Sequence, residues 1–409
     1  MSFEYFLVKR LVKNKSFNNT ITAPVIKIAI IAVALGLIVM LIAIATGLGL
    51  QHKIREKISA FNGYIEISNY DNNESQVSLK PINIHQDFYP QFTDVPSVNH
   101  VQAVLVKSAI LRTEENFQGV LIKGVGSDYK WDVFEEYLQE GRLPNYQDKL
   151  NNEILISKKI ADRLNYSLND KVIAYFVKEN GKFNIRALKI TGIYDSGYKD
   201  FDTLYVFADI RHLQKMNKWS PDEVGGFEVF VDDFSDIQNI NRQVYANISS
   251  YLDSNTIIDK FPQIFQWIDL FDMNIVAVIG IMVLVAAINM VTAILILILE
   301  RTQLIGVLKS LGANNLSIRK VFVYMASHIV LKGLLYGNII GLGGLLVQYY
   351  FQVVTLNPEN YYVRVAPVFI EWYHIVFLNI GTIGLCCVMM WFSSYLITRV
   401  SPVNVIKFQ

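Results

Sequence analysis

The apolar residues of this chain gather into four long stretches with very uneven spacing. The stretches cover residues 28–51, 273–299, 321–351 and 375–398. Residues 273–299 include no ionisable side chain and would extend about 40 Å as an α-helix, whereas the hydrocarbon core of a bilayer is about 30 Å thick. A buried helix of a soluble domain rarely stays apolar beyond about 14 residues. The pattern therefore predicts four membrane-spanning helices, with a large hydrophilic region between the first and the second.

This pattern predicts a membrane protein with four transmembrane α-helices and a large α+β domain between helices 1 and 2. The overall composition agrees, because only 18% of the residues are charged, compared with about 25% in soluble domains. We expect these segments in order: an N-terminal cytoplasmic or interfacial helix at 1–24, a first span at 25–51, an external domain at 52–270, a second span at 271–299, a cytoplasmic loop at 300–320, a third span at 321–353, a short external loop at 354–373, a fourth span at 374–398 and a tail at 399–409.

The distribution of basic residues predicts the orientation in the membrane. Lysine and arginine cluster before the first span, between the second and third, and after the fourth: Lys9, Arg10, Lys13, Lys15, Arg301, Lys309, Arg319, Lys320, Arg399 and Lys407. The positive-inside rule places these segments, and therefore both termini, in the cytoplasm. The net charge is only +1, so nothing indicates binding to nucleic acid.

The hydrophilic region reads as an α+β domain. Alternating residues predict strands at 64–68, 101–113, 117–125 and 225–231, and a hairpin of 171–178 with 183–193 around Asn180-Gly181. Helices are expected at 83–93, 157–164 and 234–252, and a composition shift near 141–145 suggests two subdomains, with 136–224 inserted into the first. The only cysteines, Cys386 and Cys387, are adjacent in the fourth span, so no disulfide framework is expected.

The cytoplasmic loop is predicted to contain a short helix that ends at Gly312. Leu304, Ile305, Leu308 and Leu311 would form one apolar stripe on it, and Asn314, Asn315 or Ser317 could cap the next helix. Such a stripe suits a groove on a soluble partner, but an ordinary turn packed against its own helix bundle would have the same pattern.

Several of these segments resemble the FtsX-like permeases of ABC transporters, and most closely the lipoprotein-releasing LolC/LolE family. The segments are Phe6–Arg10, Ala34–Gly36, Gly47–Gln51 running into Ile54–Ile58, Val285–Val291, Leu299–Ala313 and Ser401–Ile406. The resemblance covers both membrane portions and the layout, while the external domain offers no sharp motif. It implies a bacterial inner-membrane, multi-pass protein with a MacB-like periplasmic domain.

The resemblance also implies partners. Family members work as permease dimers with cytoplasmic ATPases, so we expect a LolD-like ABC ATPase and a second permease, either another copy or a paralogue. The segment formed by Glu300, Arg301, Leu304, Ile305, Leu308, Leu311 and Gly312 matches the helix that docks on the ATPase. The sequence has no Gly-x-x-x-x-Gly-Lys-Ser/Thr motif, so ATP and Mg²⁺ are expected on the partner chain and no cofactor in this one.

The function implied by the resemblance is transport by mechanotransmission: lipoprotein cargo is extracted from the inner membrane for delivery to the outer membrane, with a periplasmic lipoprotein carrier as a further partner. The alternatives are a MacB-like permease for efflux or peptide export, and an FtsX-like scaffold that regulates a cell-wall hydrolase without transporting anything. An enzyme is not expected, because the six histidines are scattered and no catalytic or metal-binding motif occurs.

A few residues inside the predicted spans invite a functional interpretation. Asn289, His328 and Lys332 are polar or ionisable, and such groups are costly in a bilayer. His328 and Lys332 also stand near the place where the family often carries an acidic residue. Lys332 could act in gating, or it could reach the interface or pair inside the bundle. Gly333, Gly337 and Gly341 would let another helix approach closely, either within the chain or in a dimer.

Overall fold

The computed structural model describes residues 10, 22–72, 75–147, 150–177 and 182–393. The chain divides into two compact units. The bundle unit comprises residues up to 51, 268–355 and those from 365 onward. The external unit comprises 52–267 together with the short segment 356–364. The predicted N-terminal helix at 1–24 and the tail at 399–409 lie largely or wholly outside the described residues.

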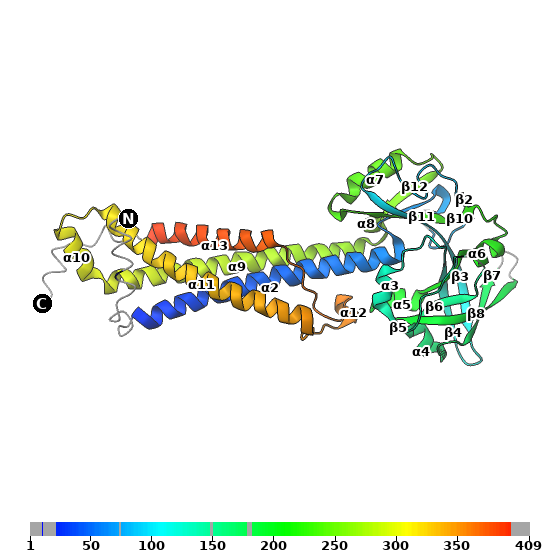
Figure 1. Cartoon of the computed structure of the whole chain (residues 1–409), viewed down its shortest axis with the longest axis horizontal. Helices are drawn as coiled ribbons and strands as arrows, with labels where there is room; N and C mark the ends of the chain where they lie inside the picture. Colours follow the sequence, from blue (N-terminus) through cyan, green and yellow to red (C-terminus); the bar gives the residue numbers. More distant parts are fainter. Residues whose placement is uncertain (1–9, 11–21, 73–74, 148–149, 178–181, 394–409) are drawn as a thin grey trace. The chain divides into compact units, whose positions relative to one another are not determined.

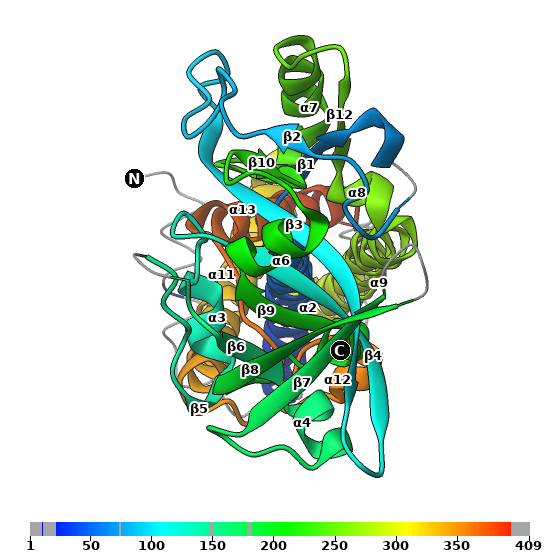
Figure 2. The same cartoon turned by 90° about the vertical axis from the view of Figure 1, so that its right-hand side faces the viewer.

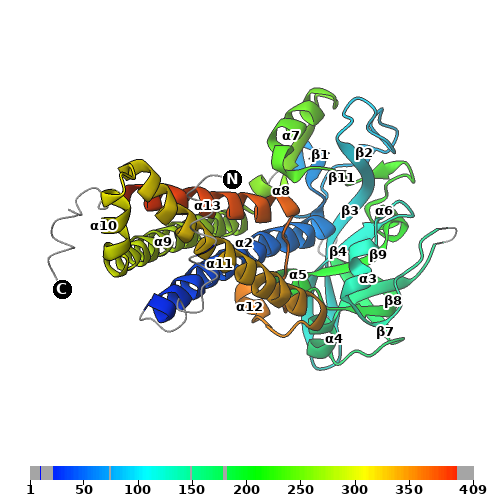
Figure 3. The ribbon, with the colours of Figure 1, turned by 60° about the vertical axis from the view of Figure 1, so that its left-hand side comes forward.

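Four helices are long and apolar enough to cross a membrane, which confirms the four predicted spans. They are α2 (Thr22–Asn62), α9 (Pro262–Glu300), α11 (Asn315–Phe351) and α13 (Trp372–Ser393), and they lie side by side in Figures 1 and 3. Two of them extend beyond the bundle unit, because α2 continues to residue 62 and α9 begins at 262. The short helix α10 (Thr302–Ser310) lies between α9 and α11 in sequence.

The bundle unit has its own apolar core. Leu37 of α2, Met290 of α9, Phe322 of α11 and Cys386 of α13 belong to one buried cluster. Large apolar side chains also cover the outside of the helices, as at Val276, where a soluble protein would carry polar residues. An apolar exterior is stable only in lipid or against another protein, which fits the predicted membrane location.

The external unit is built on a ten-stranded mixed sheet, seen in Figure 2. The strand order is β12-β1-β11-β3-β4-β9-β6-β8-β5, and β7 pairs with both β3 and β8. The strands are β1 (Ile65–Asn69), β3 (Val98–Arg112), β4 (Phe117–Val125), β5 (Leu138–Gly141), β6 (Glu153–Ser157), β7 (Lys171–Val177), β8 (Phe183–Tyr194), β9 (Tyr205–Asp209), β11 (Gly226–Val231) and β12 (Leu252–Thr256). The pairs β4–β9 and β6–β8 are parallel and the others antiparallel.

A two-stranded sheet and several short helices complete this unit. The small sheet pairs β2 (Ile82–Asn83) with β10 (Glu223–Val224). The helices are α3 (Asp132–Tyr137), α4 (Lys158–Leu164), α5 (Lys199–Leu204), α6 (Ile210–Asn217), α7 (Ile237–Ala246), α8 (Ile257–Lys260) and α12 (Pro358–Tyr361). Strands β5 to β9 come from the predicted inserted subdomain at 136–224, yet they extend the same sheet and share its buried cluster.

Most of the expected elements of the external unit form. The strands at 101–113 and 117–125 pair as predicted, and so do the two arms of the 171–193 hairpin. The helix predicted at 83–93 is wrong, since the chain turns irregularly after β2. Pro90 explains this, because proline lacks an N–H and disfavours helical geometry in the residue before it. The helix predicted at 234–252 ends at Ala246, and Leu252 begins a strand instead.

Candidate functional site

The predicted cytoplasmic helix forms as α10 and stops where the sequence indicates. Gly312 has φ +89°, a left-handed conformation that glycine adopts without steric cost. Asn314 caps α11, because its side chain accepts a hydrogen bond from the backbone N–H of Leu316. The turn between α9 and α11 is therefore defined by local sequence signals.

The apolar stripe of α10 is largely covered within the bundle unit. Ile305 and Leu308 are buried in the core of the bundle unit, and Leu304 packs against the same cluster. Leu311 alone of the four remains open, with 79% of its surface exposed. The burial of Ile305 and Leu308 favours the alternative of a turn packed on its own bundle, and docking of a partner on this loop stays a prediction.

A different face of the 300–320 loop is exposed to solvent. The exposed positions that follow helical spacing are Glu300, Gln303, Val307, Ser310 and Leu311, which we call the 300–311 face. Arg301 and Gly312 flank it, the first half-buried and the second exposed. A partner that docks on this loop meets a mixed polar and apolar surface, which is typical of transient contacts rather than of a buried apolar interface.

The three glycines of α11 face α2 within the chain. A Cβ atom added at Gly333 would lie 2.8 Å from the Cβ of Val33, and one at Gly337 would lie 3.0 Å from the carbonyl oxygen of Ala34. Gly341 similarly abuts Leu41. These contacts favour the alternative of close packing inside the bundle unit.

The polar residues of the spans lie in different surroundings. Asn338 of α11 and Asn379 of α13 exchange two side-chain hydrogen bonds, of 2.7 and 3.1 Å, a pairing that the sequence analysis missed. Asn289 is half-buried on α9, and its predicted role in joining helices stays a prediction. His328 and Lys332 are exposed on α11, so they face away from the core of the bundle unit.

The end of α2 inserts into the external unit. The ring of Phe61 is buried among Phe134, Phe201 and Phe207, with ring centroids 4.7–5.8 Å apart. The hydroxyl of Tyr129 donates to the carbonyl oxygen of Ala60 at 3.0 Å. Both apolar packing and a directed hydrogen bond therefore hold the last turn of this helix.

A buried ion pair completes this attachment, which we call the α2 clamp (Phe61, Lys123, Tyr129 and Glu228). The ammonium of Lys123 donates to the carbonyl oxygen of Phe61 at 2.6 Å and to the carboxylate of Glu228. Gln102 donates to the other carboxylate oxygen at 2.8 Å. Burial lowers the pKa of Lys123 and raises that of Glu228, while the attraction between the two charges opposes both shifts. Lys123 thus joins the central strand β4 to the end of α2.

The segment between α11 and α13 makes a second connection. Tyr362 packs edge-on against Tyr198 and Trp267, with centroids 5.0 and 5.1 Å apart. Arg364 forms an ion pair with Asp195. Lys57 of α2 donates to the carbonyl oxygen of Tyr362 at 2.6 Å and to that of Ser196. The short external loop is therefore anchored to the domain and to α2, which the sequence did not indicate.

One carboxylate beneath this contact is incompletely satisfied. Asp202 is fully buried, and its Oδ1 accepts bonds from the backbone and hydroxyl of Ser196 at 3.2 and 2.7 Å. Its Oδ2 has no hydrogen-bond partner among the described residues. Burial raises the pKa of Asp202 to about 6, and the nearby charge of Asp195 adds to the rise.

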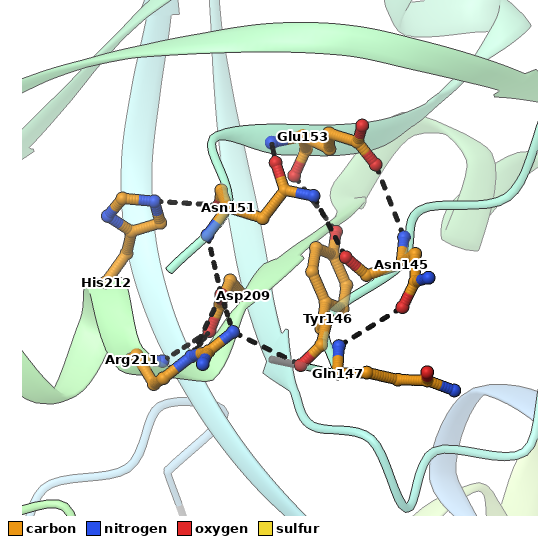
Figure 4. A network of polar contacts seen from close by, with 8 residues as sticks. All are labelled: Asn145, Tyr146, Gln147, Asn151, Glu153, Asp209, Arg211 and His212. Carbon is orange, nitrogen blue, oxygen red and sulfur yellow. Dashed lines mark hydrogen bonds and ion pairs between the residues drawn. The ribbon is translucent and has the colours of Figure 1, made fainter. Parts of the chain in front are cut away.

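A polar network near β9 could be mistaken for a reactive centre (Figure 4). Arg211 forms an ion pair with Asp209. The carboxylate of Asp209 also accepts a hydrogen bond from the backbone N–H of Asn151 at 3.0 Å. The ring of His212 shares a hydrogen bond with the carbonyl oxygen of Asn151 at 2.9 Å. These bonds hold residues 145–147 and 150–153 against β9 and α6, and they stabilise the fold. Within the described residues no group of three or more His, Cys, Asp or Glu side chains could hold a metal ion.

Two family models match the chain. One describes the MacB-like periplasmic core domain and covers residues 28–246, more than half of the 409 residues; the other describes the FtsX-like permease C-terminal region and covers 276–402. The chain therefore belongs to the family of FtsX-like ABC transporter permeases with a MacB-like periplasmic core domain, which confirms the resemblance found in the sequence. Such permeases function with an ABC ATPase and a second permease chain.

The chain is also similar to individual proteins of this family. The chain is 19% identical to the lipoprotein-releasing system transmembrane protein LolE of Haemophilus influenzae, over the full length of both. It is 18% identical to the lipoprotein-releasing system transmembrane protein LolC of Xylella fastidiosa, with 93% of each covered. Among solved structures it is similar to the extracellular domain of the noncanonic ABC-type transporter YknZ from Gram-positive bacteria, at 17% identity over 47% of this chain and 99% of that one, with a TM-score of 0.31.

Proposed function

We propose that this chain is a permease subunit that extracts lipoproteins from the bacterial inner membrane for delivery to the outer membrane. The observation that carries the proposal is the similarity to LolE, which runs through the bundle and external units alike over 100% of both chains. Both termini and the 300–320 loop lie in the cytoplasm, in agreement with the clusters of lysine and arginine. The cargo passes to a periplasmic lipoprotein carrier.

The chain works as a mechanical transmission. A separate ATPase binds and hydrolyses ATP, and it docks on the 300–311 face of the cytoplasmic loop. Ile305 and Leu308 tie that loop to the core of the bundle unit, so a displacement of α10 moves the ends of α9 and α11. Transitions of this kind are carried by helices that shift as packed bodies.

The α2 clamp explains how such motion reaches the external domain. Since α2 is one helix from Thr22 to Asn62, and Lys123 and Tyr129 hold its final carbonyl groups, a shift of the helix is passed to strand β4 rather than absorbed by a flexible linker. Lys57 also connects the same helix to the loop before α13, because it donates a hydrogen bond to the carbonyl oxygen of Tyr362. The chain itself carries out no covalent chemistry.

The test is purification of the tagged full-length chain in mild detergent from its own cells, followed by mass spectrometry of proteins and acylated peptides. We expect an ABC ATPase and acylated lipoproteins. Val307→Asp on the 300–311 face should reduce recovery of the ATPase, whereas the control Tyr245→Asp, at an exposed position of α7, should leave it unchanged.

Other outcomes would support the alternatives. Recovery of an ATPase with an outer-membrane duct protein and no lipoprotein would indicate a MacB-like export permease. Recovery of an ATPase with a cell-wall hydrolase would indicate an FtsX-like scaffold. Either result overturns the proposal of lipoprotein release.

A further inference from the structure

The segment of residues 356–364, which joins α11 to α13 in sequence, is attached within the external unit through Tyr362. The ring of Tyr362 lies edge-on against Tyr198 and Trp267, at centroid distances of 5.0 and 5.1 Å. Its carbonyl oxygen accepts a hydrogen bond of 2.6 Å from the ammonium of Lys57 on α2. One aromatic ring and one buried ammonium therefore attach this segment to the end of α2 and to the domain around it.

The backbone of Tyr362 is strained in this arrangement. Its φ is +59°, in the left-handed region that residues with a bulky side chain rarely adopt, because the Cβ atom crowds the following carbonyl oxygen. Tyrosine also lacks the short polar side chain with which asparagine can stabilise this conformation. A residue stays in such a conformation only where the surrounding contacts impose it, and strain of this kind often marks a segment that switches between states.

The attached state also buries charges that water would solvate better. Lys57 is 7% exposed, and burial of an ammonium costs free energy even where it donates hydrogen bonds. Asp202 is fully buried beneath the same contact, and its Oδ2 has no hydrogen-bond partner among the described residues. A buried polar atom without a partner costs more than one that is hydrated. Strain at Tyr362 and burial of these two charges therefore both oppose the ring contacts that attach the segment.

We propose that residues 356–364 form a latch on α2, which opens and closes while the rest of the external unit stays folded. Opening relaxes the backbone of Tyr362 and admits water to Lys57 and Asp202, whereas closing restores the ring contacts. Two states with such opposing contributions lie close in free energy, so a small displacement of α2 shifts the population between them. In the closed state α2 is connected to the segment before α13, and in the open state it is not. The inference goes beyond the proposed function, because it applies whatever the cargo is.

The experiment measures the accessibility of Val363, which is 7% exposed in the closed latch. Val363→Cys, in the full-length chain in detergent, is labelled with a water-soluble maleimide and located by mass spectrometry, which distinguishes it from Cys386 and Cys387. The reference is Val229→Cys in strand β11, where the side chain is 0% exposed and reacts only when the external unit unfolds. We expect Val363→Cys to react at least roughly a hundredfold faster, because local opening requires less free energy than global unfolding.

Two results would overturn the inference. One is an equally slow reaction at positions 363 and 229, which means that the segment opens only when the whole unit unfolds. The other is a reaction at 363 as fast as that of Tyr245→Cys, an exposed position of α7, which means that the segment is not held at all. If a cysteine variant fails to fold, hydrogen exchange of the unmodified chain gives the same comparison between residues 356–364 and β11.

Two substitutions in the Val363→Cys background should shift the latch in opposite directions. Tyr362→Ala removes ring contacts that exist only in the closed state and should raise the labelling rate roughly tenfold. The matched control Tyr361→Ala, at the neighbouring tyrosine that is 39% exposed, should leave the rate unchanged. Asp202→Asn should lower the rate, because it removes the unpaired carboxylate from the closed state.

Equal rates for Tyr362→Ala and Tyr361→Ala, or a higher rate for Asp202→Asn, would refute the latch. The readout is labelling of the chain alone and does not involve cargo. Absence of lipoproteins from the purified complex would therefore refute the proposed function and leave this result standing.

Discussion

Replacement of Lys123 tests the α2 clamp, because it removes one partner of a buried ion pair. The side chains of Lys123 and Glu228 are 1% and 5% exposed. Breaking a buried pair from one side costs about 3–5 kcal/mol, since the other charge is left without compensation. In a domain of 150–250 residues each kcal/mol lowers the melting temperature by about 2–4 °C, so Lys123→Met should lower it by roughly 6–20 °C.

The double variant Lys123→Met/Glu228→Gln separates stability from transmission. It removes the stranded charge, and glutamine keeps an oxygen for the bond from Gln102. We expect it to recover most of the lost melting temperature. It still lacks the bond to the carbonyl of Phe61, so the proposed ATP-driven lipoprotein release should remain impaired even though the protein is folded.

The assay is thermal unfolding of the full-length chain in detergent, followed by tryptophan fluorescence, beside release of lipoproteins from proteoliposomes that contain the partner ATPase. The control is Lys80→Met, which breaks the pair with Asp71, whose two side chains are 60% and 55% exposed, and should cost less than about 1 kcal/mol. If the single and double variants melt at the same temperature, or if the double variant releases lipoproteins normally, the reasoning about the clamp is refuted.

Three further predictions concern packing, titration and polar contacts. Gly337→Leu should reduce the amount of folded chain in the membrane, because even a Cβ would press on the carbonyl of Ala34; normal accumulation of the variant would contradict this packing. The pKa of Asp202 in the folded state is about 6, above its ordinary value, so protonation of Asp202 stabilises the fold fully below about pH 4 and this contribution is lost as the pH rises past 6. The melting temperature of Asp202→Asn, compared with that of the wild type, should therefore rise between pH 4.5 and 8. A difference in melting temperature that stays constant with pH would contradict this prediction. Asn338→Leu should lower the melting temperature in detergent by leaving Asn379 without its interhelical bond, at a cost of about 1 kcal/mol, and Asn338→Leu/Asn379→Leu should cost less than the single change.

Local signals in the sequence were sufficient for the elements of the membrane unit. A charge-free run of apolar residues identifies a span regardless of its neighbours, because the bilayer acts as a uniform apolar solvent. Gly312 and Asn314 were equally readable, since a left-handed turn and a helix cap depend on one or two adjacent residues. For the same reason the 171–193 hairpin and the helix of α4 could be predicted.

The candidate sites were only partly predictable. The sequence located the helix in the 300–320 loop but could not show which of its sides is buried, since Ile305 and Leu308 are apolar whether they contact an ATPase or their own bundle. The α2 clamp could not be predicted from the sequence, because Lys123 and Glu228 are 105 residues apart. Nothing in the sequence distinguishes a charged residue that is buried from one that lies on the surface. The predicted helix at 83–93 failed where Pro90 interrupts an otherwise mixed segment.

By itself, the sequence predicted four helices long and apolar enough to span a membrane, an α+β domain between the first two of them, and a resemblance to FtsX-like permeases. These features follow from composition and from periodicity over short windows, where the solvent or the backbone sets the preference. Only the tertiary structure decided that the glycines of α11 face α2, that Asn338 pairs with Asn379, and that Lys57 and Lys123 tie α2 to the external unit. These pairings join residues distant in the chain, and their stability depends on burial and geometry that exist only after the elements have packed.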